Sequence, residues 1–112
     1  MKFQVFQFGL SRADIDDACA NGPSEKYLSY IQCRNAPQCS TIIKAKSFYK
    51  KVAEVTSRSF EDVVAEGGMK GIGYVGDVII SETGVAKFVS FVGLTDLVQY
   101  TDRQVEEYVE FV

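Results

Sequence analysis

Apolar and polar residues alternate along some segments of the chain and recur with a helical period in others. The segment Met1–Gly9 contains Phe3, Val5, Phe6 and Phe8. In an extended chain these side chains fall on both faces, which is typical of a central strand that is covered on both sides. We therefore predict that this segment forms a central strand of a sheet.

The next segment predicts a helix followed by a second strand. Ser11 stands three residues before Asp14, and this N-cap pattern predicts a helix over Arg12–Ala20 that stops at Asn21-Gly22-Pro23. The following residues, Lys26–Cys33, are rich in β-forming side chains and are expected to form a strand. A short helix starting at Pro23 is the alternative, because proline suits the first helical position.

The middle of the chain has the longest helical pattern, which predicts a helix over Thr41–Ser57 capped by Ser40 or Thr41. Its apolar stripe comprises Ile42, Ala45, Phe48, Tyr49, Val52 and Val55. Ser59, three residues before Asp62, predicts a further short helix over Phe60–Glu66, which Gly67-Gly68 ends.

A β-hairpin is predicted from Gly71–Ile80 and Val85–Leu94, joined by the turn Ser81-Glu82-Thr83-Gly84. Glycine at the last turn position favours a type I turn with a bulge, in which Ser81 faces Val85. That register places Asp77 and Lys87 diagonally on one face. A two-residue loop is the alternative, and it would place them on opposite faces.

The carboxyl-terminal pattern predicts a last helix over Thr101–Val112, in which Thr101 and Gln104 form a capping box. The chain of 112 residues suits a single domain covering residues 1–112. We expect an α+β fold in which three or four helices pack on a mainly antiparallel sheet of about four strands. Apolar runs are too short for a membrane span, so we expect none. The first residues do not match the pattern of a signal peptide, so we expect none there.

Composition narrows the possible chemistry. The chain has no histidine, which excludes Ser-His-Asp and Cys-His catalysis and histidine metal sites. Its three cysteines, Cys19, Cys33 and Cys39, favour free thiols in a reducing, cytoplasmic environment. A Cys33–Cys39 bridge is the alternative, and a zinc site would lack its fourth ligand. We expect no metal, no cofactor and no enzymatic activity.

Two further motifs have a functional and a structural interpretation. Gly71-Ile72-Gly73-Tyr74-Val75-Gly76 matches a dinucleotide-binding pattern, but a short helix precedes it and β-branched residues follow it. Gly71 and Gly73 are instead expected on one strand face, where another backbone approaches closely. Asp77 and Lys87 form either an acid–base pair or, as we expect, an ordinary pair on the sheet surface.

Charge is distributed unevenly along the chain. Residues 1–58 hold nine basic and five acidic residues, whereas residues 59–112 hold three basic and ten acidic residues. The predicted long helix carries Lys46 and Lys50, with Ile43 between them as an exposed contact residue or as an isolated surface isoleucine. The predicted last helix carries an acidic ridge of Asp102, Glu106 and Glu110.

These charges lead to three functional hypotheses. The first is a small protein-binding module, an inhibitor or adaptor acting through Asp102, Glu106, Glu110, Ile43, Lys46 and Lys50. Its small size suits an antagonist of a larger machine, such as a phage protein that acts against host defence. The alternatives are a nucleic-acid-binding module that uses the basic Lys44–Arg58 helix, and a small-ligand-binding protein. No membrane partner is expected, and the oligomeric state stays open.

Overall fold

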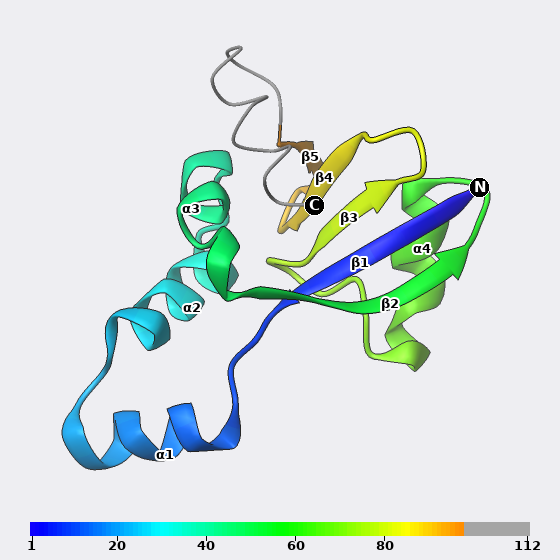
Figure 1. Ribbon diagram of the computed structural model, residues 1–112. Coiled ribbons are helices and arrows are strands. Elements are labelled where there is room, and N and C mark those ends of the chain that lie inside the picture. The colour runs from blue at the N-terminus through cyan, green and yellow to red at the C-terminus, as the bar shows by residue number, and fades with distance from the viewer. Residues whose placement is uncertain (98–112) are drawn as a thin grey trace.

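One antiparallel sheet organises the part of the chain that the computed structural model describes, residues 1–97. The sheet has five strands in the order β2-β1-β3-β4-β5, and each neighbouring pair is antiparallel. Helices lie beside it (Figure 1). The predicted α+β class and antiparallel sheet are confirmed, with five strands where about four were expected.

The elements follow one another in an irregular alternation of helices and strands. Their bounds are β1 Lys2–Phe8, α1 Arg12–Asn21, α2 Glu25–Asn35, α3 Cys39–Lys44, the 3-10 turn η1 Lys46–Phe48, β2 Tyr49–Thr56, α4 Phe60–Gly67, the 3-10 turn η2 Gly68–Lys70, β3 Val78–Ser81, β4 Ala86–Ser90 and β5 Gly93–Asp96.

The sheet is covered on both faces, as the pattern of β1 predicts. One face packs against residues of α2 and α3, and its buried cluster comprises Phe6, Cys33, Cys39, Ile42, Ile43, Ala45, Tyr49, Val78, Ile80, Ala86, Phe88 and Leu97. The other face packs against α4, and its buried cluster comprises Phe3, Val5, Val63, Ile72, Ile79 and Val89. Strand β1 therefore supplies both cores, with Phe3 and Val5 on the α4 side and Phe6 and Phe8 on the α2–α3 side.

The predicted serine caps of α1 and α4 are confirmed. The Ser11 side chain accepts a hydrogen bond from the Asp14 backbone, and the Asp14 side chain accepts one from the Ser11 backbone, which completes a capping box. At α4 the Ser59 side chain accepts from the Asp62 backbone. Both helices thus begin where the local sequence supplies a partner for an otherwise unpaired N–H group.

The predicted hairpin register is also confirmed. Ser81 donates its N–H to the Val85 carbonyl at 2.9 Å, and Gly84 adopts the positive φ of 87° that the bulged turn requires. The strands are shorter than predicted, because β3 starts only at Val78 and the sequence before it forms a loop. At the other end the chain turns at Phe91 and Val92 and returns as β5.

The strand predicted over Lys26–Cys33 is wrong, because these residues lie within α2. The Ser24 side chain accepts a hydrogen bond from the Tyr27 backbone and caps this helix. The alternative of a helix is therefore correct, but its predicted start at Pro23 is wrong, because Ser24 is the N-cap and α2 begins at Glu25. Local capping outweighed the β-propensity of the tyrosines.

The helix predicted over Thr41–Ser57 is wrong beyond its first turn, because α3 ends at Lys44. The chain is helical over α3, bends through η1, and then forms β2 paired with β1. Tyr49, Ala53 and Val55 are the less exposed residues of β2 and alternate along it, whereas Val52 of the predicted stripe is 48 % exposed. Pairing with the central strand β1 decides between the two patterns, since β-branched residues fit a half-buried sheet.

This change of element also relocates the predicted contact residues. Ile43 lies in α3 and is only 6 % exposed, so the prediction of an exposed isoleucine is wrong. Lys46 lies in η1 and Lys50 in β2, and no helix joins them. The basic helix Lys44–Arg58 of the nucleic-acid hypothesis therefore does not form. The predicted last helix, with Asp102, Glu106 and Glu110, lies outside the described residues.

Within residues 1–97, every helix is too short or too polar to traverse a lipid bilayer.

Candidate functional site

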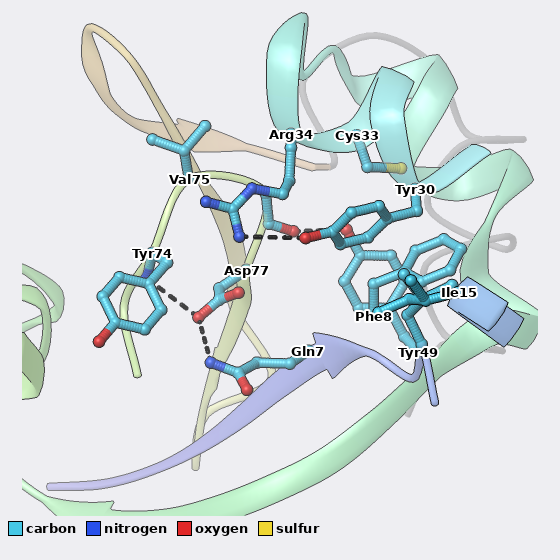
Figure 2. A pocket seen from close by; sticks show the side chains of 12 residues that line it. Gln7, Phe8, Ile15, Tyr30, Cys33, Arg34, Tyr49, Tyr74, Val75 and Asp77 are labelled. Atoms are coloured by element: carbon cyan, nitrogen blue, oxygen red, sulfur yellow. Dashed lines mark hydrogen bonds between the residues drawn. The ribbon is translucent and has the colours of Figure 1, made fainter. Parts of the chain in front are cut away.

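A pocket opens at the end of the sheet where β1 stops and where β2 and β3 begin. Its volume is about 230 Å³. The lining residues come from β1, α1, α2, β2 and the loop before β3, and comprise Gln7, Phe8, Leu10, Ile15, Tyr30, Cys33, Arg34, Tyr49, Tyr74, Val75, Gly76 and Asp77. Figure 2 shows these side chains converging from segments that are far apart in the sequence.

The glycine-rich segment before β3 forms one wall of the pocket as a loop. Gly71, Gly73 and Gly76 all have positive φ, at 73°, 81° and 93°. The expectation that Gly71 and Gly73 lie in a strand is therefore wrong: their left-handed φ values bend the chain into turns, and β3 starts only at Val78. No helix opens at the end of this motif either, so the geometry of a dinucleotide-binding turn is missing.

Two of these glycines allow a close approach to helices. A Cβ atom on Gly73 would lie 3.1 Å from Cα of Val64 in α4. A Cβ atom on Gly76 would lie 2.8 Å from the carbonyl oxygen of Cys33 in α2. The predicted close approach of another backbone is confirmed at Gly73 but is wrong at Gly71, where a Cβ atom would meet nothing within 4 Å. Gly76 makes a second and tighter contact, so the loop packs against both α2 and α4.

Asp77 is the buried polar group of this pocket, with 6 % of its surface exposed. Its Oδ2 atom accepts hydrogen bonds from Gln7 Nε2 at 2.9 Å and from the backbone N–H groups of Gly73 and Tyr74 at 3.0 Å each. These bonds hold the loop closed around the carboxylate (Figure 2). Within residues 1–97 the second oxygen, Oδ1, receives no hydrogen bond.

Burial raises the pKa of Asp77 above its ordinary value, since removal from water disfavours the charged form. The hydrogen bonds from Gln7, Tyr74 and Gly73 and the positive charge of Arg34 oppose this rise in pKa. The carboxylate is thus stabilised on one oxygen only, and a further donor on Oδ1 would favour its charged form.

Aromatic rings form the opposite wall. The Phe8 ring contacts Tyr30 and Tyr49 at centroid distances of 5.6 and 5.7 Å, both edge to face. The Tyr49 hydroxyl is buried and donates to the Gly76 carbonyl. This bond joins β2 to the loop of residues 71–76, called the glycine loop below. Burial also raises the pKa of Tyr49 well above its usual range, so this hydroxyl stays protonated.

Arg34 lies in the last turn of α2 and brings a positive charge to the pocket. Its guanidinium carbon lies 5.8 Å from the centre of the Tyr30 ring, and its Nη1 donates to the Tyr30 hydroxyl at 3.3 Å. No carboxylate of residues 1–97 forms an ion pair with this guanidinium. Arg34 is therefore exposed and oriented, with hydrogen-bonding capacity to spare.

Helix α1 contributes Ile15 to the outer side of the pocket, although none of its residues is buried. In Figure 1 it lies away from the sheet. An ion pair of 2.8 Å between Asp14 and Lys26 joins it to α2. The hydrogen bond from Lys26 and those from Ser11 lower the pKa of Asp14 to about 2.

No disulfide joins the cysteines of residues 1–97, and two of the three side chains are buried. Cys33 lines the pocket but is 1 % exposed, and burial raises its pKa, which disfavours the reactive thiolate. Cys39 is buried and donates to the Leu97 carbonyl at 2.7 Å. Cys19 is exposed on α1.

The sequence pattern singled out Asp77, Cys33 and the segment Tyr74-Val75-Gly76 separately, and all of them line this pocket, but the pairing of Asp77 with Lys87 was wrong. Asp77 belongs to the pocket, whereas the Lys87 ammonium lies 3.7 Å from Asp96 and over the Phe60 ring at 4.9 Å. Gln7 and Arg34 were missed altogether. Neither residue belongs to a motif that sets it apart from other polar residues of the chain. Gln7 reaches Asp77 because β1 lies beside β3, and Arg34 reaches the pocket because its segment forms α2.

Because the pKa of Asp77 is raised in the folded state, its contribution to stability is greatest below the unfolded pKa of about 3.9 and is lost as the pH rises through the folded pKa. We expect Asp77→Asn to lack this loss. Wild-type stability relative to the variant, measured by urea unfolding, should therefore fall as the pH rises above the unfolded pKa of about 3.9. The lowered pKa of Asp14 acts in the opposite direction but cancels, because both proteins contain it. A rise of wild-type stability relative to the variant would contradict the assignment.

Comparisons of this chain with protein-family models, with curated proteins and with solved structures found no match. The function proposed below is therefore inferred from the geometry of the pocket.

Proposed function

We propose that this chain is a non-catalytic module that binds a small polar ligand in the pocket between α2, β1 and the glycine loop. The observation that carries the proposal is the Asp77 carboxylate, buried at 6 % exposure with one oxygen open and walled by aromatic rings. Ligand sites combine apolar and aromatic walls with a few fixed polar groups, and this pocket has that composition.

The size of the pocket limits the ligand. Its volume of about 230 Å³ is below the range of roughly 300–1,000 Å³ for pockets that take drug-sized molecules. The ligand is therefore a small metabolite and not a dinucleotide. This agrees with the loop conformation of the Gly71–Gly76 segment.

The ionisable groups of the pocket favour binding over catalysis. The raised pKa values of Cys33 and Tyr49 keep both groups protonated near neutral pH. Asp77 already holds three donors on one oxygen and has no second proton-transfer group positioned beside it in the described chain.

The free thiols further support a reducing compartment such as the cytoplasm.

Backbone amide NMR with a panel of amines, carboxylic acids, amino acids, nucleosides and sugars tests this proposal. At least one class should shift the resonances of Gly73–Asp77 and Arg34. Tyr30→Ala should weaken that binding by about 3- to 10-fold, because it removes an aromatic wall. Tyr27→Ala is the matched control, since Tyr27 lies on the same helix and outside the pocket lining. Shifts with no class of probe, or equal effects of both variants, would refute the proposal.

A protein partner is the second candidate function, and an exposed apolar turn favours it. Phe91 and Val92, between β4 and β5, are 70 % and 95 % exposed. They adjoin a groove of about 490 Å³ that is lined by Val64 and Leu94 and by the charged residues Glu61 and Lys87. The Lys87 ammonium lies 3.7 Å from an Asp96 carboxylate oxygen, whereas Glu61 forms no ion pair within residues 1–97. The occupant that fits is a peptide segment with an apolar anchor and a basic flank.

Charge reversal separates this second candidate from the ligand site. A peptide with one aromatic anchor and flanking lysines should bind in fluorescence anisotropy, and Phe91→Ser should weaken it by about 10-fold or more. Glu61→Lys should weaken it further at low salt. Glu82→Lys, at the far hairpin turn, is the charge-matched control. Binding that is unchanged in Phe91→Ser excludes this groove.

A further inference from the structure

We propose that the ligand of this pocket is a free α-amino acid with an apolar side chain, its ammonium group on Asp77 and its carboxylate on Arg34. This inference rests on the proposed binding function and names its ligand class. Three observations carry it, namely the open oxygen of Asp77, the guanidinium that forms no ion pair within residues 1–97, and the apolar side chains that line the same pocket.

The first observation concerns Oδ1 of Asp77. An ionised carboxylate accepts hydrogen bonds at both oxygens, and buried acceptors are nearly always satisfied. Here Oδ2 has three donors and Oδ1 has none within residues 1–97. In Figure 2 the dashed lines reach only one of the two oxygens. A protonated amine supplies both the missing donors and the opposite charge.

The second observation concerns Arg34. Its planar guanidinium matches a carboxylate with two parallel hydrogen bonds, and the described chain offers it only the Tyr30 hydroxyl and ring. The hydrogen bond to Tyr30 and the contact with its ring restrain the guanidinium, so less side-chain entropy is lost when an anion binds. Arg34 and Asp77 line the same pocket but form no ion pair with each other.

Together these two charges select a ligand that carries both signs. A simple amine would be attracted by Asp77 but repelled by Arg34, and a simple carboxylic acid would meet the reverse. A zwitterion satisfies both, and the two charges of an α-amino acid are close enough for a pocket of this volume. Phe8, Ile15 and Val75 supply apolar surface for its side chain.

Isothermal titration calorimetry with L-leucine and L-phenylalanine tests the inference, with the N-acetyl and amide derivatives of each as comparison. The free amino acids should bind, and each derivative should bind about 10-fold weaker or more, because it lacks one charge. The N-acetyl forms resemble the carboxyl end of a peptide and the amides resemble its amino end. Equal binding of either derivative would therefore replace a free amino acid with a peptide terminus and overturn the inference.

Variants assign the two charges to their residues. Asp77→Asn and Arg34→Met should each weaken binding of the free amino acid by roughly 10- to 100-fold. Asp77→Asn should remove the preference over the N-acetyl form, and Arg34→Met the preference over the amide. Arg58→Met is the matched control, since Arg58 is 93 % exposed in its side chain and pairs with Asp62 away from the pocket. Arg34 is exposed, so its variant keeps the test valid if Asp77→Asn does not fold.

Failure of this inference is distinguishable from failure of the proposed function. If no amino acid binds while another class of the NMR panel shifts the pocket resonances, the inference is wrong and the binding module stands. If both pocket variants bind L-leucine and L-phenylalanine as the wild type does, the inference is likewise wrong. If no class of probe shifts those resonances, both proposals fall.

Discussion

Gly76→Ala is expected to destabilise the protein by roughly 2–5 kcal/mol. Two independent costs coincide at this position. Gly76 has a φ of 93°, which side-chain-bearing residues rarely adopt, and its Cβ would lie 2.8 Å from the Cys33 carbonyl oxygen. That oxygen belongs to the backbone of α2 and cannot rotate away, so the loop or the helix must shift. The midpoint of urea unfolding measures the loss.

Gly68→Ala is the matched control for this substitution. Gly68 has a right-handed φ of −55° and ψ of −39°, and a Cβ there would meet no atom within 4 Å. We expect stability to be unchanged or raised by about 0.4–1 kcal/mol, because alanine restricts the unfolded chain. Similar stabilities for the two variants would show that the loop does not pack against α2 as described. The loop also holds Asp77, so Gly76→Ala should weaken ligand binding in the same samples.

Phe88→Ala is expected to cost about 3–5 kcal/mol. Phe88 is 2 % exposed in β4 and packs in the core cluster between the sheet and α3. Truncation removes its apolar contacts and leaves a cavity that the surrounding strands cannot fill, because strand pairing fixes their spacing. Thermal and urea unfolding should both report the loss.

Phe91→Ala provides the comparison, since the two phenylalanines are three residues apart in the same hairpin. Phe91 is 70 % exposed at the turn, and its truncation should change stability by less than about 0.5 kcal/mol. The burial pattern of β4 would be incorrect if Phe91→Ala were the more costly of the two. A stable Phe91→Ala protein also serves the partner-binding test, because any lost affinity then reflects the turn itself.

The pocket was far less predictable than the strands around it. Asp77 was noticed in the sequence, but as a partner of Lys87, because the hairpin register alone places those two residues near each other. Its actual partners come from the end of β1 and from the glycine loop. Those contacts depend on β1 lying between β2 and β3, which is a long-range property that no local pattern encodes.

The basic residues of the middle segment were also placed wrongly by local pattern alone. The residues Tyr49–Thr56 fit a helical stripe and also fit a strand, so charge and periodicity alone placed Lys46, Lys50 and Ile43 on one helix. Pairing with β1 resolved the ambiguity in favour of the strand. The prediction that Lys46 and Lys50 lie on one basic helix was wrong, because the two residues belong to η1 and β2.

The sequence by itself determined the features that depend on a few neighbouring residues. Ser11 and Ser59 start their helices, Gly84 closes the hairpin in the expected register, and β1 has two apolar faces. These signals are local because a cap or a turn satisfies its own hydrogen bonds. Only the tertiary structure decided that residues 49–56 pair as a strand and that Arg34 meets Asp77 in one pocket. Both outcomes depend on contacts between distant segments, whose free energy outweighs local propensity.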